Sequence, residues 1–182
     1  MLVDLNSFNN STFSRGKPKW VEVLWQLTQV FIVSTGIPGS GFRVRLLRMF
    51  GAKIGHNVVI KSGLKVKFPW RLQIGDNSWI GEDVWIDNLA EVSIGDNCCI
   101  SQGVYFCTGN HNWAKKSFDL VLGKIVVEDA AWLCAMSRVG PNVRIKQGAI
   151  LTLGSSVVTN MEAYSVYTGV PATYIKERKI AA

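Results

Sequence analysis

The chain repeats one four-residue phrase three times, as Ile54-Gly55-His56-Asn57, Ile74-Gly75-Asp76-Asn77 and Ile94-Gly95-Asp96-Asn97. The copies stand twenty residues apart. A fixed period in this range is typical of repeat architectures. Within the second interval a large apolar residue recurs in steps of six at Ile80 and Ile86, and a step of eight then completes the interval.

The same rhythm defines a set of lead positions along most of the chain. A period of six fits neither an amphipathic helix nor a half-buried strand. It fits a coil with three flat faces, in which the lead residue points inward, a small residue occupies the corner, and a glycine after the lead takes the turn because it tolerates positive φ. The lead positions are Ile54, Ile60, Val66, Ile74, Ile80, Ile86, Ile94, Ile100, Phe106, Val127, Leu133, Val139, Ile145, Leu151 and Val157.

These positions predict an all-β fold, a parallel β-helix of about five coils with about eighteen residues in each. We expect three segments: an N-terminal arm with short helices over residues 1–53, the β-helix with a loop at 109–124 over residues 54–163, and a tail over residues 164–182. With 182 residues and 48% apolar content, the chain is sufficient for one sizeable core.

Charge and cysteine content constrain partners and compartment. The net charge of +7 is compatible with an anionic ligand or surface. The four cysteines lack CxxC spacing, so we expect free thiols, no metal site and a reducing cytoplasmic environment. The first ten residues do not read as a signal peptide. Nothing in the sequence indicates a nucleic-acid partner.

The N-terminal segment is expected to form two short helices, at residues 20–35 and 41–50. In the first, Glu22, Gln26 and Gln29 form a polar stripe, and the run is too short and too polar to span a bilayer. Two interpretations stay open and are compatible: the helices cap the end of the solenoid, or they lie on an anionic membrane at its inner face. The opposite side of the first helix carries Val23, Leu24, Leu27, Val30 and Phe31.

The rhythm fails once, between Phe106 and Val127, where about thirteen residues leave the repeat. Loops that leave a rigid scaffold are frequent sites of chemistry. This loop carries His111, one of the two histidines. An exposed histidine without a function is the alternative for His111, whereas we interpret His56 as structural because it occupies a turn position that aspartate fills in the other copies.

The repeat, the loop from Cys107 to Trp113 (Cys-Thr-Gly-Asn-His-Asn-Trp) and the closing run from Tyr167 to Ala172 (Tyr-Thr-Gly-Val-Pro-Ala) together resemble the left-handed β-helix acyltransferases. The chain is most similar to the O-acetyltransferases of exopolysaccharide synthesis, of the colanic-acid type. The resemblance covers nearly the whole chain. It implies a left-handed solenoid, a homotrimer with active sites between the prisms, acetyl-CoA as co-substrate, and a sugar or polysaccharide precursor as acceptor.

The resemblance also implies roles for individual residues. His111 would be the general base that takes the proton of the acceptor hydroxyl, a step for which imidazole is suited near neutral pH. Asn88, with Asp87 and Trp113, would bind the acceptor. The residues expected to hold coenzyme A are Trp132, Ala135, Leu153, Gly154 and Lys176. Leu153 and Cys134 depart from the smaller residues of the family pattern and would narrow the slot for the pantetheine arm.

Other functions of this fold are weighed against the acetyltransferase. A carbonic anhydrase of this fold needs three histidines per metal ion, and the chain has two. A nucleotidyltransferase would need a second domain, and a serine acetyltransferase usually has a longer helical N-terminal region. Two alternatives stay open: a non-catalytic trimeric scaffold that binds glycan or membrane, and an acetyltransferase for another small hydroxyl or amine.

Overall fold

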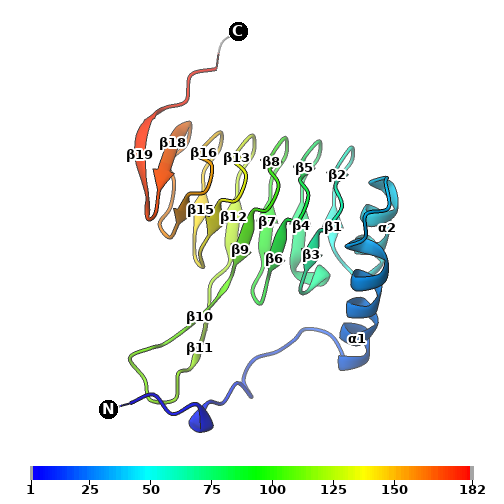
Figure 1. Ribbon diagram of the computed structural model, residues 1–182, viewed down its shortest axis with the longest axis vertical. Helices are drawn as coiled ribbons and strands as arrows, with labels where there is room; N and C mark the ends of the chain where they lie inside the picture. Colours follow the sequence, from blue (N-terminus) through cyan, green and yellow to red (C-terminus); the bar gives the residue numbers. More distant parts are fainter. Residues whose placement is uncertain (1, 181–182) are drawn as a thin grey trace.

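The computed structural model describes residues 2–180. Its main body is a parallel β-solenoid of three sheets, with two helices at one end, a long hairpin leaving one corner, and an antiparallel strand pair at the other end (Figure 1). This confirms the repeat fold as a mostly β, parallel solenoid, and two helices precede it in the chain.

The interior of the solenoid is made by the lead positions. All fifteen are buried, with exposures between 0% for Val66 and 9% for Ile54. The small residues four positions later are buried too, among them Ser78, Cys98 and Ala131. The period of six therefore identified the core correctly, because each coil contributes one inward side chain from each of its faces.

The glycines after the lead positions have a different function from the one predicted. Gly81 does not have a positive φ; the left-handed turn residues lie two positions further on, as at Asp83 (φ 55°). A Cβ on Gly81 would lie only 2.6 Å from the backbone N of Gln102 in the next coil. Glycine is needed there because adjacent coils approach closely, not because of the backbone conformation.

The first sheet has five strands in parallel register, so that Ile54, Ile74 and Ile94 stack directly. In spatial order its strands are β1 (Lys53–Ile54), β4 (Leu72–Ile74), β7 (Val92–Ile94), β12 (Ile125–Val127) and β15 (Arg144–Ile145). The third sheet, also of five strands, stacks in the same way. Its strands are β3 (Lys65–Val66), β6 (Trp85–Asp87), β9 (Tyr105–Cys107), β14 (Arg138–Val139) and β17 (Ser156–Val157).

The second sheet is longer than the others. Its strands are β2 (Val59–Ile60), β5 (Trp79–Ile80), β8 (Cys99–Ile100), β13 (Trp132–Leu133), β16 (Ile150–Leu151), β18 (Ser165–Gly169) and β19 (Ala172–Glu177). β18 lies within the predicted tail, yet it pairs in parallel with β16 and begins a further coil. β19 then folds back antiparallel on β18 and forms the last strand of the sheet.

The other end of the solenoid is covered by helices α1 (Lys19–Thr28) and α2 (Gly41–Met49), joined through a π-helical turn (Gln29–Val33). Side chains from this cap satisfy the backbone of the first coil, which has no strand beyond it. Trp25 Nε1 donates to Val66 O at 2.7 Å, and Val66 N donates to Gln29 Oε1 at 2.6 Å. Ile60 N donates to Ser40 Oγ at 2.7 Å. The capping interpretation is therefore confirmed.

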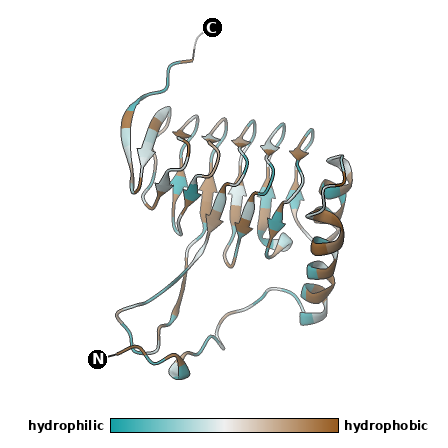
Figure 2. Ribbon diagram, viewed as in Figure 1, coloured by the Kyte–Doolittle hydropathy of each residue, from teal (hydrophilic) through white to brown (hydrophobic). Residues whose placement is uncertain are grey.

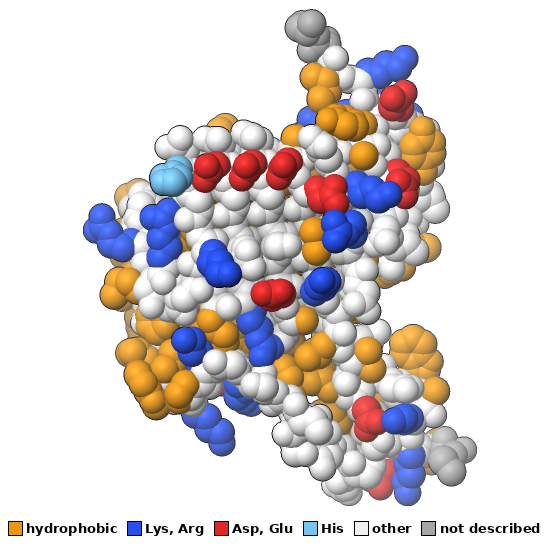
Figure 3. Space-filling view, turned by 180° about the vertical axis from the view of Figure 1, so that it is seen from behind, with side chains coloured by type: hydrophobic (Ala, Val, Ile, Leu, Met, Phe, Trp, Pro, Cys, Tyr) orange, Lys and Arg blue, Asp and Glu red, His pale blue; other side chains and the backbone are white. Residues whose placement is uncertain are grey.

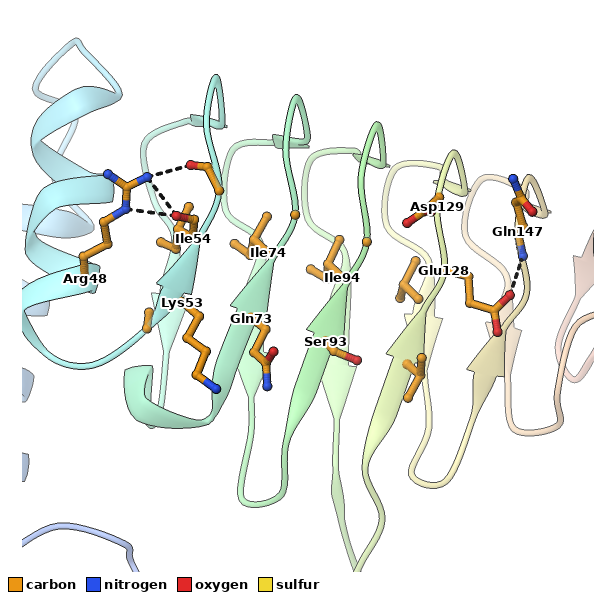
Figure 4. A pocket seen from close by; sticks show the side chains of 16 residues that line it. Arg48, Lys53, Ile54, Gln73, Ile74, Ser93, Ile94, Glu128, Asp129 and Gln147 are labelled. Carbon is orange, nitrogen blue, oxygen red and sulfur yellow. Dashed lines mark hydrogen bonds between the residues drawn. The ribbon is translucent and has the colours of Figure 1, made fainter.

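The arginines of α2 also serve the cap. Arg43 is buried and donates to four backbone carbonyls, including those of Val33 and Thr35. Arg48 donates to Ile54 O at 3.0 and 2.8 Å on the edge strand β1 (Figure 4). Of the three arginines of α2, Arg45 is exposed and has no such role.

The N-terminal arm runs back along the molecule to the hairpin that leaves the solenoid (Figure 1). It contains a 3₁₀ turn at Leu5–Ser7, and a second 3₁₀ turn at Pro69–Arg71 lies in the first coil. Asp4 N donates to Lys116 O at 2.9 Å, and Trp70 Nε1 donates to Arg15 O at 2.8 Å. The arm, expected to be extended or loosely ordered, is thus held at both of its ends.

Candidate active site

The loop that interrupts the repeat is an antiparallel hairpin. Its strands are β10 (Gly109–His111) and β11 (Leu120–Leu122), and His111 pairs directly with Leu120. The base of the hairpin is tied to the coil before it, because Thr108 Oγ1 donates to Asp87 O at 2.9 Å and accepts from Ala90 N at 3.0 Å. The hairpin therefore presents His111 from the corner that also carries Asp87 and Asn88.

The imidazole of His111 is held in one orientation. Its Nδ1 lies 2.8 Å from Phe118 O, and its ring stacks on the Phe118 ring at 4.3 Å between centroids and 4° between planes. Phe8 of the N-terminal arm covers it from a second side at 5.6 Å. A carbonyl oxygen can only accept, so Nδ1 carries the proton. In the neutral ring Nε2 then has a free lone pair and can act as a base.

The tip of the hairpin is fixed by polar contacts. Lys115 Nζ lies 2.9 Å from Asp119 Oδ2, and Ser117 Oγ donates to Asp119 Oδ1 at 2.7 Å. These hydrogen bonds, that from Ser117 foremost, lower the pKa of Asp119. Trp113 stands at the tip and is exposed. Its role in binding the acceptor stays a prediction.

The side chains of Asn88 and Asp87 differ in how accessible they are to an acceptor. Asn88 is 0% exposed; its Nδ2 donates to Phe68 O at 2.7 Å and Phe68 N donates to its Oδ1 at 2.9 Å. Its amide thus holds the corner to the preceding coil, and direct acceptor binding would require these bonds to open. Asp87 is partly exposed; its Oδ1 lies 3.2 Å from Lys67 Nζ, an ion pair without hydrogen-bond geometry. The Oδ1 atom itself is buried, and Asp87 Oδ2 accepts from Tyr105 Oη at 3.4 Å.

A cavity of about 790 Å³ lies between the N-terminal arm, this corner and the hairpin. Arg71 lines it and donates to Leu89 O and Ser14 O, which joins the corner to the arm. Burial lowers the pKa of Arg71, while nearby Glu91 acts in the opposite direction. The other lining residues are largely polar: Asn9, Asn10, Ser11, Thr12, Phe13, Ser14, Leu89, Ala90, Glu91, Asp119, Leu120 and Leu122.

The residues predicted to hold coenzyme A lie elsewhere on the solenoid. Ala135 and Gly154 occupy successive turns between the second and third sheets, joined by the bond from Gly154 N to Ala135 O at 3.0 Å. Leu153 beside them is 71% exposed. Trp132 is partly exposed on β13, and its Nε1 donates to Ser101 Oγ at 3.0 Å. Lys176 is on β19, three strand spacings from β13, or about 14 Å.

The predicted site residues therefore fall into two groups on one chain. His111, Asp87 and Asn88 lie at the corner between the third and first sheets, whereas Ala135 and Leu153 lie at the corner between the second and third sheets. The whole width of the third sheet separates them. Each group is assembled by the fold, but the structure of one chain does not bring the two together.

A second cavity of about 790 Å³ lies on the outer face of the first sheet (Figure 4). Arg48, Lys53, Gln73 and Glu128 line it, and none of the predicted site residues does. Within residues 2–180 there is also no cluster of three or more His, Cys, Asp or Glu side chains that could hold a metal ion.

Sequence reasoning did not identify three residues at the His111 site: Phe118, Phe8 and Arg71. The bond to His111 uses the backbone carbonyl of Phe118, which any residue would have supplied. Phe8 lies far from the loop in sequence and reaches it through the path of the N-terminal arm, whereas Arg71 belongs to the first coil and lines the same cavity as Leu120. No spacing or motif marks such contacts.

Comparison with known proteins gives the family. No protein-family model matches the chain. The chain is 39% identical over 177 residues to the protein named colanic acid biosynthesis acetyltransferase WcaF in Escherichia coli (strain K12), covering 96% of the chain and 97% of WcaF. It is 25% identical over 138 residues to the galactoside O-acetyltransferase of the same organism, covering 74% of the chain and 68% of that protein.

Solved structures agree with this at the level of the fold. A hexapeptide-repeat acetyltransferase of Vibrio cholerae in complex with acetyl coenzyme A superimposes with a TM-score of 0.81 at 20% identity, over 89% of each chain. A galactoside acetyltransferase in complex with coenzyme A gives 0.78 at 20% identity, over 88% of this chain and 82% of the other. Given the identity with WcaF over nearly the full length of both chains, the protein belongs to the hexapeptide-repeat acetyltransferases, in the family of the colanic acid biosynthesis acetyltransferase.

Proposed function

We propose that the protein is an acetyl-CoA-dependent O-acetyltransferase that acts on a sugar hydroxyl of a polysaccharide or its precursor, with His111 as general base. The observation that carries the proposal is the contact of 2.8 Å between His111 Nδ1 and Phe118 O. It assigns the proton to Nδ1 and leaves Nε2 free to accept the proton of an acceptor.

The reaction needs little more from His111 than this lone pair. As the acceptor oxygen attacks the thioester carbonyl carbon, Nε2 takes the hydroxyl proton. The C–O bond forms, the C–S bond breaks, and the thiolate of coenzyme A receives the proton back from His111. A positioned base of this kind contributes on the order of 10²–10⁴ in rate. Stacking on Phe118 holds the ring in place for both transfers.

The second group of residues offers a surface for the donor substrate. A side chain built on Gly154, where φ is +68°, would meet no atom within 4 Å, so the turn is open toward solvent. The exposed Leu153 can pack against a pantetheine arm, and Lys176 supplies a positive charge for a phosphate. Leu153 and Cys134 make this surface bulkier than the family pattern predicts, which favours binding along the turn rather than in a deep slot.

The polar cavity between the N-terminal arm and the hairpin suits a sugar, although none of the predicted site residues, His111 included, lines it. Asn, Ser, Thr, Arg, Glu and Asp side chains line it, and such groups bind hydroxyls by hydrogen bonds. Leu120, which pairs with His111 across the hairpin, forms part of its wall. Asp87 lies at the end of β6 below the hairpin and can accept a hydrogen bond from a second hydroxyl. These positions favour a polar, multi-hydroxyl acceptor over an apolar one.

We further propose that the active enzyme is a homotrimer with a left-handed solenoid. The two groups of site residues lie at different corners of one prism, so a complete site needs His111 from one copy and the donor surface from the next. Three copies around an axis would form three such sites. The four free cysteines are compatible with function in the reducing cytoplasm.

The test is acetyl transfer from acetyl-CoA to a panel of sugars and oligosaccharides, detected by mass. We expect a product that carries one added acetyl group, and a rate for His111→Ala lower by about 10²–10⁴ with the oligomer intact. His56→Ala is the matched control, because His56 is exposed at a turn of the solenoid and should leave the rate unchanged. Equal rates for His111→Ala and the wild type would overturn the mechanism.

The same experiment also tests one alternative function. A non-catalytic scaffold that binds glycan would transfer no acetyl group to any sugar of the panel but would still bind some of them. The bulky, exposed Leu153 favours such a scaffold, because it would narrow the slot for the pantetheine arm. Binding of acetyl-CoA to the wild type, weakened by Leu153→Arg, would count against the scaffold.

A further inference from the structure

The helical cap carries an apolar surface that the fold leaves uncovered. Along α1 and the π-helical turn, apolar side chains recur at positions 20, 23, 24, 27, 30 and 31 and face solvent. Trp20 is 69% exposed and Phe31 70%, values that are high for aromatic residues of a helix packed on a core. Figure 2 shows the helix as the most continuous apolar segment outside the solenoid. The outward-facing residues are Trp20, Val23, Leu24, Leu27, Val30 and Phe31.

The apolar stripe of α1 points the opposite way from that of most surface helices. An amphipathic helix on a protein surface buries its apolar stripe and exposes its polar stripe. Here Trp25, Gln29 and Val33 face the solenoid, and the Trp25 and Gln29 side chains bond the open edge of β3. The π-helical turn, with the bond from Ser34 N to Gln29 O at 2.9 Å, keeps Val33 on the same inward side. Capping therefore uses Gln29 of the polar stripe together with Trp25 and Val33, and leaves the apolar stripe with no partner within the described chain.

Charge is concentrated at the same end of the molecule. Residues 5–75 contain eleven Lys and Arg and a single acid, Glu22, a net charge of +10. The rest of the chain has nine basic and twelve acidic residues, a net charge of −3. Lys17 and Lys19 are exposed beside the apolar stripe, and Arg45 is exposed on α2. In Figure 3 orange and blue side chains gather together at this end.

We propose that this face, defined by the six outward apolar residues of α1 and its π-helical turn, docks on an anionic lipid bilayer. The apolar side chains would enter the boundary between headgroups and acyl chains, with Trp20 at the level where tryptophan is enriched. Lys17, Lys19 and Arg45 would contact lipid phosphates. In residues 2–180 no helix is long and apolar enough to cross a membrane, so the contact is peripheral.

A second copy of the chain is a poorer occupant of this face. Pairing two caps would bring two ends of +10 charge together, and that repulsion opposes association. An anionic bilayer has the opposite charge and attracts basic residues near its surface by about 1 kcal/mol each. Charge and apolarity therefore favour lipid over self-association.

The experiment is co-sedimentation of the full chain with vesicles of mixed phosphatidylcholine and phosphatidylglycerol, compared with phosphatidylcholine alone. We expect binding to the mixed vesicles, weakened by salt, and binding to the neutral vesicles lower by at least about ten-fold. Replacement of two apolar residues, Leu27→Ser with Phe31→Ser, should lower binding to the mixed vesicles by at least about ten-fold. Lys17→Gln with Lys19→Gln should lower it by a similar factor.

The matched control is Val158→Ser, which removes an exposed apolar side chain on the body of the solenoid and should bind as the wild type does. Circular dichroism and sedimentation of each variant test that fold and oligomer are kept. Equal binding of Leu27→Ser/Phe31→Ser and the wild type would overturn the proposal. The proposal would also be overturned if the wild type did not bind vesicles and the double substitution dissociated its oligomer. That pair of results would mean that a second copy occupies this face.

Discussion

The imidazole of His111 is held by one backbone carbonyl and by aromatic contacts. The hairpin closes in such a way that Phe118 presents its carbonyl to Nδ1 and its ring to the imidazole face. No carboxylate is needed to select the tautomer, since a carbonyl accepts only from a protonated nitrogen. The proposed base is therefore oriented by the path of the chain, and the identity of residue 118 matters for stacking alone.

Loss of that stacking should affect the turnover rate and not donor binding. In Phe118→Leu the carbonyl remains while the aromatic contact is lost, and such pairs contribute about 0.5–1.5 kcal/mol. We expect kcat to fall by about two- to ten-fold, with the KM for acetyl-CoA unchanged. Phe118→Tyr keeps the ring and should restore kcat. A rise in KM with kcat intact would mean that Phe118 acts on binding and does not position His111.

At this scale the sequence predicted much of the interior and only part of the site. Lead residues such as Ile80 and Phe106 were identified correctly because burial enforces the period of six. The reason for Gly81 was wrong, because a sequence does not display the distance between successive coils. Asn88 and Asp87 were named together, but only the structure distinguishes the amide that holds the corner from the carboxylate that is partly exposed.

At the scale of elements, the cap shows how a solenoid ends. The first coil has unpaired backbone groups on three strands, and side chains of α1, α2 and their connection satisfy them one by one. The sequence predicted the helix and its polar stripe, but not that Gln29 of this stripe faces inward. The unpaired edge of β3 explains that orientation, because Gln29 Oε1 accepts from Val66 N.

The cap bonds should contribute measurably to stability. Gln29→Leu removes the acceptor of Val66 N in a buried setting, and an unsatisfied buried donor costs about 1–3 kcal/mol. We expect the free energy of unfolding in urea to fall by that amount. Gln26→Leu, on the preceding turn and only half-buried, is the control and should change it by less than about 0.5 kcal/mol. Similar losses in both variants would show that the edge bond is unimportant.

Stacked coils are also joined by an ion pair whose strength depends on pH. A hydrogen bond from Arg144 at 2.7 Å lowers the pKa of Glu128 below its ordinary value of 4.5, and Gln147 N donates to the same carboxylate at 3.0 Å. A lowered folded pKa means that Glu128 stabilises the protein above pH 4.5 and that this contribution is lost as the pH falls through the folded value.

The wild type should therefore have a higher Tm than Glu128→Gln at neutral pH, and the difference should shrink as the pH is lowered below 4.5. Thermal unfolding followed by circular dichroism at several pH values measures this. Because the pair is largely exposed, the difference will be small. A constant difference across the range would show that Glu128 contributes through contacts that do not depend on its charge.

At the scale of the whole molecule, the proposed function depends on how copies assemble. On one chain the His111 corner and the proposed donor surface near Leu153 are separated by the third sheet. The sequence resemblance predicted a trimer with sites between prisms, and the proposed mechanism requires one because of this separation. The cap that is proposed to face the membrane lies at the end of the solenoid, so all three copies of a parallel trimer would present it on the same side.

The most direct test of this account is complementation between two inactive variants. His111→Ala lacks the base, and Gly154→Trp blocks the donor surface; each alone should be inactive. After the two are unfolded and refolded together in equal amounts, about one interface in four joins an intact His111 to an intact donor surface. We predict recovery of about a quarter of the wild-type rate of acetyl transfer. No recovery in mixed trimers of confirmed composition would contradict a site shared between copies.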